Sequence, residues 1–267
     1  MPSASALRLQ IESSLERRFP AALSPLPRTY SETAPTRIPA IDRLLDGGLP
    51  IGAISEITGP ASSGRTSLAL AFLAARTSED RVCAWVDLSD AFDSESAAAN
   101  GVALRQLLWV RLNNPSPLAH PKSARPKSPR PNSPSPVYSN LDQALRATDL
   151  LLQAGGFSAI VLDLGGISAD HGKRVPLATW FRFRQAADRT RCSLLVLAQQ
   201  PLAQSSAAVV LECTPLNRPQ PAQTVLTACT FQASSGRQRF TPFLSSQRKP
   251  PTSTWSATSP AQREVSA

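Results

Sequence analysis

The residues of this sequence best suited to chemistry form a short loop at 59–66, Gly-Pro-Ala-Ser-Ser-Gly-Arg-Thr. Its template is G-x-x-x-x-G-K-[ST], in which backbone N–H groups surround a phosphate, the lysine reaches the β- and γ-phosphates and the final hydroxyl binds Mg²⁺. Gly59, Gly64 and Thr66 match the template, whereas Arg65 stands where the lysine is expected. Arginine keeps the charge but is longer, planar and forked, so it does not simply replace lysine at a tight site. The loop therefore predicts a nucleotide-binding architecture with altered phosphate chemistry.

The segments around this loop alternate between short apolar runs and helical patterns, which predicts an α/β fold. Nearly continuous apolar strands that alternate with helices are typical of a parallel sheet buried on both faces. After Pro201 the alternation stops, and we expect an antiparallel extension. The expected strands are 53–58, 82–88, 107–112, 159–164, 193–198, 207–214, 225–231 and 238–243, and the expected helices are 66–75, 97–104, 140–153 and 177–189.

Four segments are distinguished from the core by their composition. Residues 1–20 carry apolar side chains at a four-residue repeat and predict an amphipathic helix, followed by a linker at 21–36 rich in Pro, Ser and Thr. We expect the core to span 37–244. It is interrupted by a disordered insertion at 114–139, which holds eight prolines, four basic residues and no acidic residue. The last segment, 245–267, predicts a disordered tail.

Charge and cysteine content narrow the class of protein. The formal net charge is +9, which favours an anionic partner such as nucleic acid, although the same charge can simply solubilise flexible segments. The four cysteines show no C-x-x-C spacing, and Cys83 and Cys192 lie in apolar strands, so we expect buried free thiols rather than disulfides or a zinc site. Apolar runs are too short for a membrane span, and we expect a cytoplasmic protein with no membrane partner.

The flanks of the loop carry a more specific resemblance. Gly47-Gly48-Leu49-Pro50-Ile51-Gly52 leads into Glu56-Ile57-Thr58-Gly59-Pro60. This arrangement resembles the bacterial recombinase RecA and its relatives, in which a G-G-L-P-x-G turn precedes an E-I-x-G-P-x-S-S-G-K-T loop. Later segments, 83–93, 141–164 and 194–200, continue the resemblance in order. It implies a RecA-like P-loop fold with a mainly parallel central sheet, flanking helices and an antiparallel extension.

The resemblance also implies roles for individual residues, and one of them has changed. Ser89 stands where the family has the glutamate that activates the attacking water. A hydroxyl without a neighbouring base cannot accept a proton from that water near neutral pH. Asp90 or Glu95 could in principle substitute for it. Ser96 stands in place of a tyrosine that stacks on adenine. The nucleotide-binding set that the resemblance implies is Gly59, Ser62, Ser63, Gly64, Arg65, Thr66, Asp93, Asp163 and Gln199, with Thr66 and Asp163 as the Mg²⁺ ligands.

These substitutions predict a catalytically degenerate protein that binds ATP and Mg²⁺ weakly. Loss of a positioned general base costs roughly 10²–10⁴ in rate. The chain is similar to ImuA, the RecA-like partner in translesion-synthesis cassettes. We therefore expect an accessory role in DNA repair and the SOS response, through polymerase-like proteins, RecA and single-stranded DNA. One alternative is an active, ATP-dependent recombinase or RadA-like ATPase. The other is a SulA-like inhibitor of cell division, which the positive charge disfavours.

Overall fold

Eight strands form one mixed sheet in the computed structural model, which describes residues 32–112, 136–216, 228–238 and 252–258. The order across the sheet is β10-β9-β8-β3-β7-β6-β4-β5, with parallel pairing from β8 to β5 and antiparallel pairing between β8, β9 and β10. This arrangement confirms the predicted fold class. The strands are β3 Ile54–Thr58, β4 Cys83–Asp87, β5 Leu107–Arg111, β6 Ala159–Asp163, β7 Ser193–Ala198, β8 Ala207–Leu216, β9 Ala228–Gln238 and β10 Thr252–Thr258.

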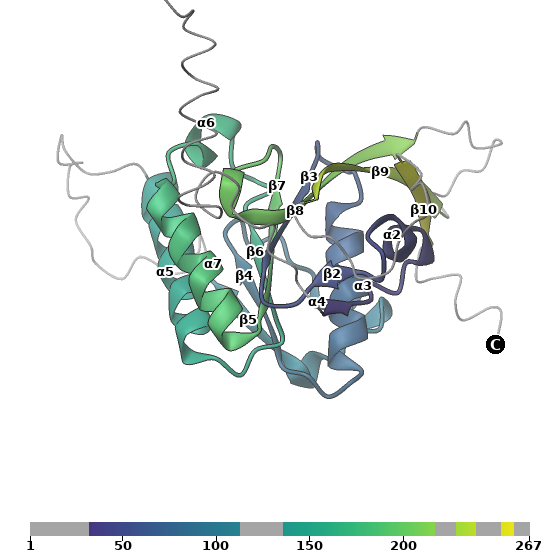
Figure 1. The fold of residues 1–267 in the computed structure, drawn as a ribbon, viewed down its shortest axis with the longest axis horizontal. Coiled ribbons are helices and arrows are strands. Elements are labelled where there is room, and N and C mark those ends of the chain that lie inside the picture. The colour runs from purple at the N-terminus through teal and green to yellow at the C-terminus, as the bar shows by residue number, and fades with distance from the viewer. Residues whose placement is uncertain (1–31, 113–135, 217–227, 239–251, 259–267) are drawn as a thin grey trace, which may run out of the picture.

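Helices cover both faces of the sheet, which explains why the central strands are apolar along their whole length (Figure 1). In β4, for example, Cys83 and Trp85 belong to one core cluster, while Ala84 and Val86 belong to the other. Successive side chains point to opposite faces of a strand, so a strand covered on both faces must be apolar at every position. The first cluster packs beneath α2 Pro39–Leu44, α3 Arg65–Thr77 and α4 Ser94–Ala99, and the second beneath α5 Pro136–Ala154 and α7 Leu177–Thr190.

Strand β3 leads directly into the phosphate loop and lies in the middle of the sheet, between β7 and β8. The loops that follow β4, β6 and β7 leave the same edge, because all these strands are parallel. In open α/β sheets, ligands bind in the crevice outside the carboxyl ends of the strands. The topology therefore gathers the loop, the end of β6 and the end of β7 at one site.

The structure corrects the expected tail at 245–267. Residues 252–258 form β10, which pairs along its whole length with β9 and packs against α2. Trp255 supplies the physical reason, because its side chain is only 7% exposed and its ring lies 5.4 Å from that of Phe231. A buried aromatic pair gives this segment the apolar contact that its Ser/Thr-rich composition conceals.

Two further boundaries differ from those expected. The end of the linker at 21–36 is structured, because Thr33–Ala34 (β1) pairs with Leu49–Pro50 (β2). The helix expected at 97–104 divides into α4 and a short 3₁₀ turn, η1 Leu104–Gln106, because Gly101 adopts a φ of 88° that ends the α-helix. The predicted helix at 1–20, the strand predicted at 238–243 beyond Gln238, and most of the insertion at 114–139 lie outside the described residues.

Candidate functional site

The phosphate loop contains two glycines whose close neighbours leave no room for a side chain. The N–H of Gly59 donates to the carbonyl of Ala198 at 3.2 Å, and a Cβ at Gly59 would lie 2.2 Å from the carbonyl oxygen of Cys213. Gly64 caps the N-terminus of α3 with a φ of 89°, and its Cβ would lie 2.6 Å from the ring of Phe231. The loop therefore ends at the N-terminus of a 13-residue helix, whose free N–H groups and dipole favour an anion.

The antiparallel extension forms one wall of the loop, which the sequence did not indicate. Phe231 lies on β9 and contacts Gly64, while Trp255 on β10 packs behind Phe231. Both aromatic residues belong to the same core cluster as the apolar face of α3. The strands after β8 therefore support the nucleotide loop as well as widening the sheet.

Arg65 extends from the start of α3 toward the turn that follows β6. A Cβ built on Gly165 would lie 3.2 Å from both Nη atoms of Arg65 and 3.0 Å from Oδ1 of Asp163. The guanidinium and the carboxylate thus flank the same glycine. Asp163 Oδ1 also accepts the backbone N–H of Gly165 at 2.9 Å, which fixes the turn. Arg65 Nη1 is buried and has no hydrogen-bond partner among the residues that the structure describes.

Burial dominates the electrostatics of this pair. It lowers the pKa of Arg65 from its ordinary value, against the opposing effect of the Asp163 charge. It raises the pKa of Asp163, and the charge of Asp87 raises it further, while the Gly165 N–H and Arg65 act in the opposite direction. Both groups therefore lose solvation that they do not fully regain from each other. An anionic ligand with several acceptor oxygens would satisfy the guanidinium, because Arg pairs strongly with phosphate.

The carboxylates at the end of β4 are engaged in holding the local structure. Asp87 is fully buried and accepts hydrogen bonds from the N–H groups of Ser89, Ala91 and Phe92 at 2.9–3.2 Å and from Trp109 Nε1 at 3.3 Å. Asp90 forms a bidentate ion pair with Arg111 at 2.8 and 2.7 Å, and that hydrogen bonding lowers the pKa of Asp90. The lowered pKa makes Asp90 a weaker base, and Asp87 is buried and already accepts four hydrogen bonds, so neither group is suited to activating water.

Ser89 itself reaches the same edge of the sheet. Its side chain is exposed, and its Oγ would lie 2.1 Å from a Cβ on Gly166, in the turn after Asp163. The position that the resemblance assigns to the water-activating glutamate therefore faces the nucleotide site, but it carries only a hydroxyl.

Asp93 and Ser96 occupy the start of α4. Asp93 is the N-cap of this helix and accepts from the N–H groups of Glu95 and Ser96 and from the Ser96 hydroxyl. These bonds lower the pKa of Asp93, chiefly through the Ser96 hydroxyl. The structure therefore gives Asp93, a member of the nucleotide-binding set that the resemblance implies, the role of a helix cap. Glu95 is exposed in the first turn of the helix.

Gln199 lies close to the Arg65–Asp163 pair, as the resemblance implies. Its Nε2 donates to the carbonyl of Gly165 at 3.2 Å, so the residue after β7 touches the turn that holds Asp163. The following segment is tied to the sheet by Glu56, which is fully buried in β3 and accepts the N–H groups of Leu202 and Ala203 at 2.6 and 2.8 Å. In the sequence, this contact could have been indicated by Glu56 itself, because it is a charged residue within an apolar strand.

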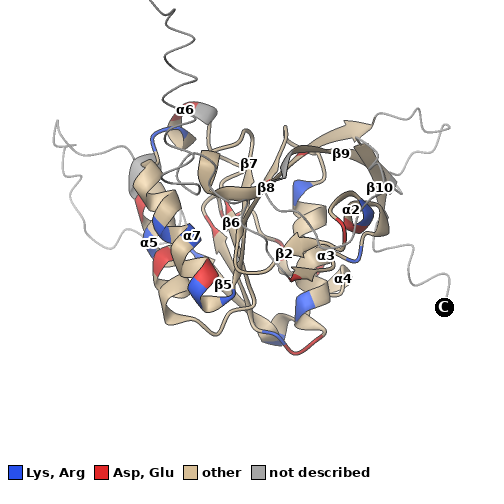
Figure 2. Ribbon diagram, in the orientation of Figure 1, with Lys and Arg blue, Asp and Glu red and all other residues tan. Residues whose placement is uncertain are grey.

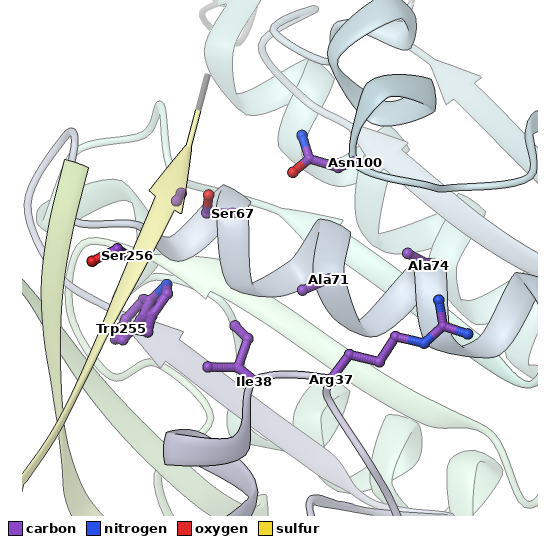
Figure 3. Close-up of a pocket in the computed structure, with 9 residues that line it drawn as sticks. Arg37, Ile38, Ser67, Ala71, Ala74, Asn100, Trp255 and Ser256 are labelled. Carbon is purple, nitrogen blue, oxygen red and sulfur yellow. The ribbon is translucent and has the colours of Figure 1, made fainter. Parts of the chain in front are cut away.

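A cavity of about 300 Å³ opens beside the loop helix (Figure 3). Its floor is the outer face of α3, where Ser67, Ala71 and Ala74 follow the phosphate loop. Asn100 borders it on one side and Trp255 on the other. The Nε1 of Trp255 is buried without a hydrogen-bond partner among the described residues, so a ligand acceptor would satisfy it. This cavity could hold the part of a nucleotide that extends beyond the phosphates.

Comparison with known proteins agrees with this geometry. Residues 23–115 match the sequence model of the RecA N-terminal domain. The chain is 32% identical over 180 residues to the protein RecA of Brucella anthropi, covering 60% of this chain and 43% of that protein. It is 28% identical over 180 residues to the protein RecA of Allorhizobium ampelinum, covering 60% and 42%. The chain thus spans less than half the length of these curated relatives.

A solved structure supports the fold independently of the sequence matches. The crystal structure of the RadB recombinase superposes with a TM-score of 0.54 at 17% identity, covering 83% of this chain and 94% of that one. At this identity the likeness establishes the fold alone. Together with the sequence matches, it supports a relationship to the RecA-like recombinases.

Two further observations concern sites of other kinds. Cys83, Cys192 and Cys213 are buried free thiols and Cys229 is a half-buried one. Burial raises the pKa of Cys83 and of Cys213 to about 12. Within the described parts of the chain, no helix is both long and apolar enough to cross a membrane.

Proposed function

We propose that this chain is a catalytically degenerate RecA-like accessory protein of DNA repair that retains a nucleotide-binding loop. In this role it takes part in SOS-type translesion synthesis, as ImuA-type proteins do, and works through contacts with polymerase-like proteins, RecA and single-stranded DNA. The similarity to RecA proteins supports the repair context. The chemistry of the site supports the loss of turnover.

The observation that carries the proposal is the state of the carboxylates around the loop. Hydrolysis needs a base that can deprotonate a water near the γ-phosphate. The position expected for this base carries Ser89, which has only a hydroxyl. Of the two neighbouring carboxylates, Asp87 is buried and accepts four hydrogen bonds, and Asp90 is paired with Arg111. Arg65, which is directed to Gly165, stands in place of the usual lysine, and Ser89 stands in place of the expected base; phosphoryl transfer depends almost entirely on such positioned groups.

The exposed charges are consistent with protein contacts on the helical face. Both α5 and α7 carry Arg and Asp side chains (Figure 2), and Arg182 pairs with Asp149 across the two helices at 3.0 Å. The basic surplus of the chain lies largely in segments outside the described residues, such as the insertion between β5 and α5. We assign DNA contact to that insertion and partner contact to the predicted helix at 1–20.

ATP turnover, measured with and without single-stranded DNA, tests the proposal. We expect background hydrolysis in both conditions, unchanged in Asp163→Ala and in the surface control Asp149→Ala. DNA-stimulated turnover that Asp163→Ala abolishes and Asp149→Ala preserves would instead establish the active recombinase or RadA-like ATPase, with Glu95 as the base to examine.

Partner contacts are tested separately. We expect removal of residues 1–20 to abolish capture of a polymerase-like partner or RecA, and removal of 114–135 to weaken binding of single-stranded DNA and flatten its salt dependence. Unchanged capture and an unchanged salt slope would remove these two assignments and leave the turnover result standing.

A further inference from the structure

The place where a divalent cation would be expected is already bordered by a fixed positive charge. The two side chains that could hold Mg²⁺ are the exposed hydroxyl of Thr66 and the carboxylate of Asp163. Arg65 lies beside Asp163, because a Cβ on Gly165 would be 3.2 Å from both Nη atoms of Arg65 and 3.0 Å from Asp163 Oδ1. No group of three or more His, Cys, Asp or Glu side chains that could hold a metal exists in the described part of the chain.

These residues do not fit a Mg²⁺ ion well. Mg²⁺ requires a nearly octahedral shell of oxygen atoms and gives up its waters reluctantly, so it needs open space around its ligands. Here a guanidinium borders that space, and one oxygen of Asp163 is already engaged by the Gly165 N–H. The planar guanidinium is also bulkier than the amine of the usual lysine, so it leaves less room for the water shell of the ion.

The guanidinium itself has an unmet requirement. Arg65 Nη1 is buried, and no acceptor among the described residues reaches it. Buried donors are nearly always paired, so the arrangement calls for an acceptor from a ligand. A phosphate group at the N-terminus of α3 supplies several such oxygens, and the planar fork of arginine matches phosphate in a bidentate manner.

We propose that Arg65 takes the place of the divalent cation, so that this site binds the phosphates of a nucleoside diphosphate or triphosphate without Mg²⁺. The proposal rests on the nucleotide loop of the proposed function and specifies its ligand. The fixed cation neutralises phosphate charge and lies beside Asp163, near the position where a metal would be expected. Binding without a metal is compatible with a site that senses or stores nucleotide and does not split it.

The turn after β6 is built for this arrangement. Gly165 leaves room for the guanidinium, because any Cβ there would be crowded by both Arg65 and Asp163. Gln199 holds the carbonyl of Gly165 at 3.2 Å and so keeps the turn in place from the neighbouring strand. Gly165→Ala is therefore expected to displace Arg65 and weaken nucleotide binding without removing any charged group.

The test is the affinity of the full chain for a fluorescent nucleoside diphosphate and for unlabelled ADP, ATP and pyrophosphate, in excess Mg²⁺ and in excess chelator. We expect wild-type affinities in the two conditions to agree within about threefold. Arg65→Lys shortens and narrows the cation, and it should make binding at least about tenfold tighter with Mg²⁺ than without it. Arg182→Lys makes the same exchange on the α5–α7 face and should behave as wild type.

Two results would overturn the proposal. One is wild-type binding that Mg²⁺ tightens by about tenfold or more, and the other is the absence of nucleotide and pyrophosphate binding in both conditions. The thermal unfolding transition of each variant, measured without nucleotide, shows whether a variant that does not bind is still folded. Binding that Mg²⁺ tightens would leave the accessory role standing, whereas the absence of binding would also remove the retained nucleotide-binding loop. The loss of turnover is tested separately, because only DNA-stimulated hydrolysis would contradict it.

Discussion

Replacement of Trp255 provides the strictest test of how the phosphate loop is supported. This residue lies on β10, is 7% exposed, and packs 5.4 Å from Phe231, which in turn contacts Gly64 of the loop. Truncating a buried aromatic side chain to alanine costs about 3–5 kcal/mol, of which the aromatic pair supplies about 0.5–1.5 kcal/mol. We expect Trp255→Ala to lower the free energy of unfolding by an amount in this range, since the strand has few other buried side chains.

Trp255→Phe separates packing from the indole N–H. Phenylalanine keeps a ring against Phe231 and removes a buried donor that has no partner among the described residues. Leaving such a donor unsatisfied costs about 1–3 kcal/mol, which partly offsets the smaller ring. The loss in Trp255→Phe should therefore stay below about 1.5 kcal/mol.

Urea unfolding followed by far-ultraviolet circular dichroism measures both variants, with the slope of each transition checked for constancy. Leu150→Ala is the matched control, because Leu150 is 69% exposed on α5 and should change stability by less than about 0.5 kcal/mol. A Trp255→Ala variant as stable as this control would refute the reasoning, because it would show that the Trp255 side chain does not hold β10 on the core.

Three further predictions follow from the site. Because burial raises the pKa of Asp163, this carboxyl stabilises the fold at acidic pH and loses that contribution as pH rises through its raised pKa. Asp163→Asn should therefore raise the thermal midpoint at neutral pH, and the difference should vanish below the ordinary carboxyl pKa; a constant difference at every pH would contradict this. Gly64→Ala should cost about 1–3 kcal/mol, measured by the same urea unfolding, because its Cβ meets Phe231 and its φ is positive. A thiol reagent should label Cys229 first under native conditions, as peptide mass mapping would show, because the other three cysteines are buried; equal labelling of all four would oppose it.

The fold could be predicted from the sequence because its evidence is local. Apolar runs such as 159–164 and 193–198 lie at the positions of β6 and β7 almost to the residue, and alternation with helices makes those strands parallel. A strand whose stability depends on a distant partner gives no such pattern. Residues 252–258 are mostly Ser and Thr, and their strand depends on pairing with β9 and on the contact of Trp255 with Phe231, the residue opposite it on that strand.

The sequence by itself determined the loop, the unusual Arg65, the absence of an acid at Ser89 and the succession of strands and helices along the chain, because each is a matter of residue type and spacing. Only the tertiary structure decided what these residues do to one another. Spacing along the chain cannot show that Arg65 lies against Gly165 and Asp163, or that Asp90 is held by Arg111. Those contacts join residues far apart in sequence, and their energies depend on burial and on the distances between charges. Both are set only when the parallel strands bring their carboxyl ends to one edge of the sheet.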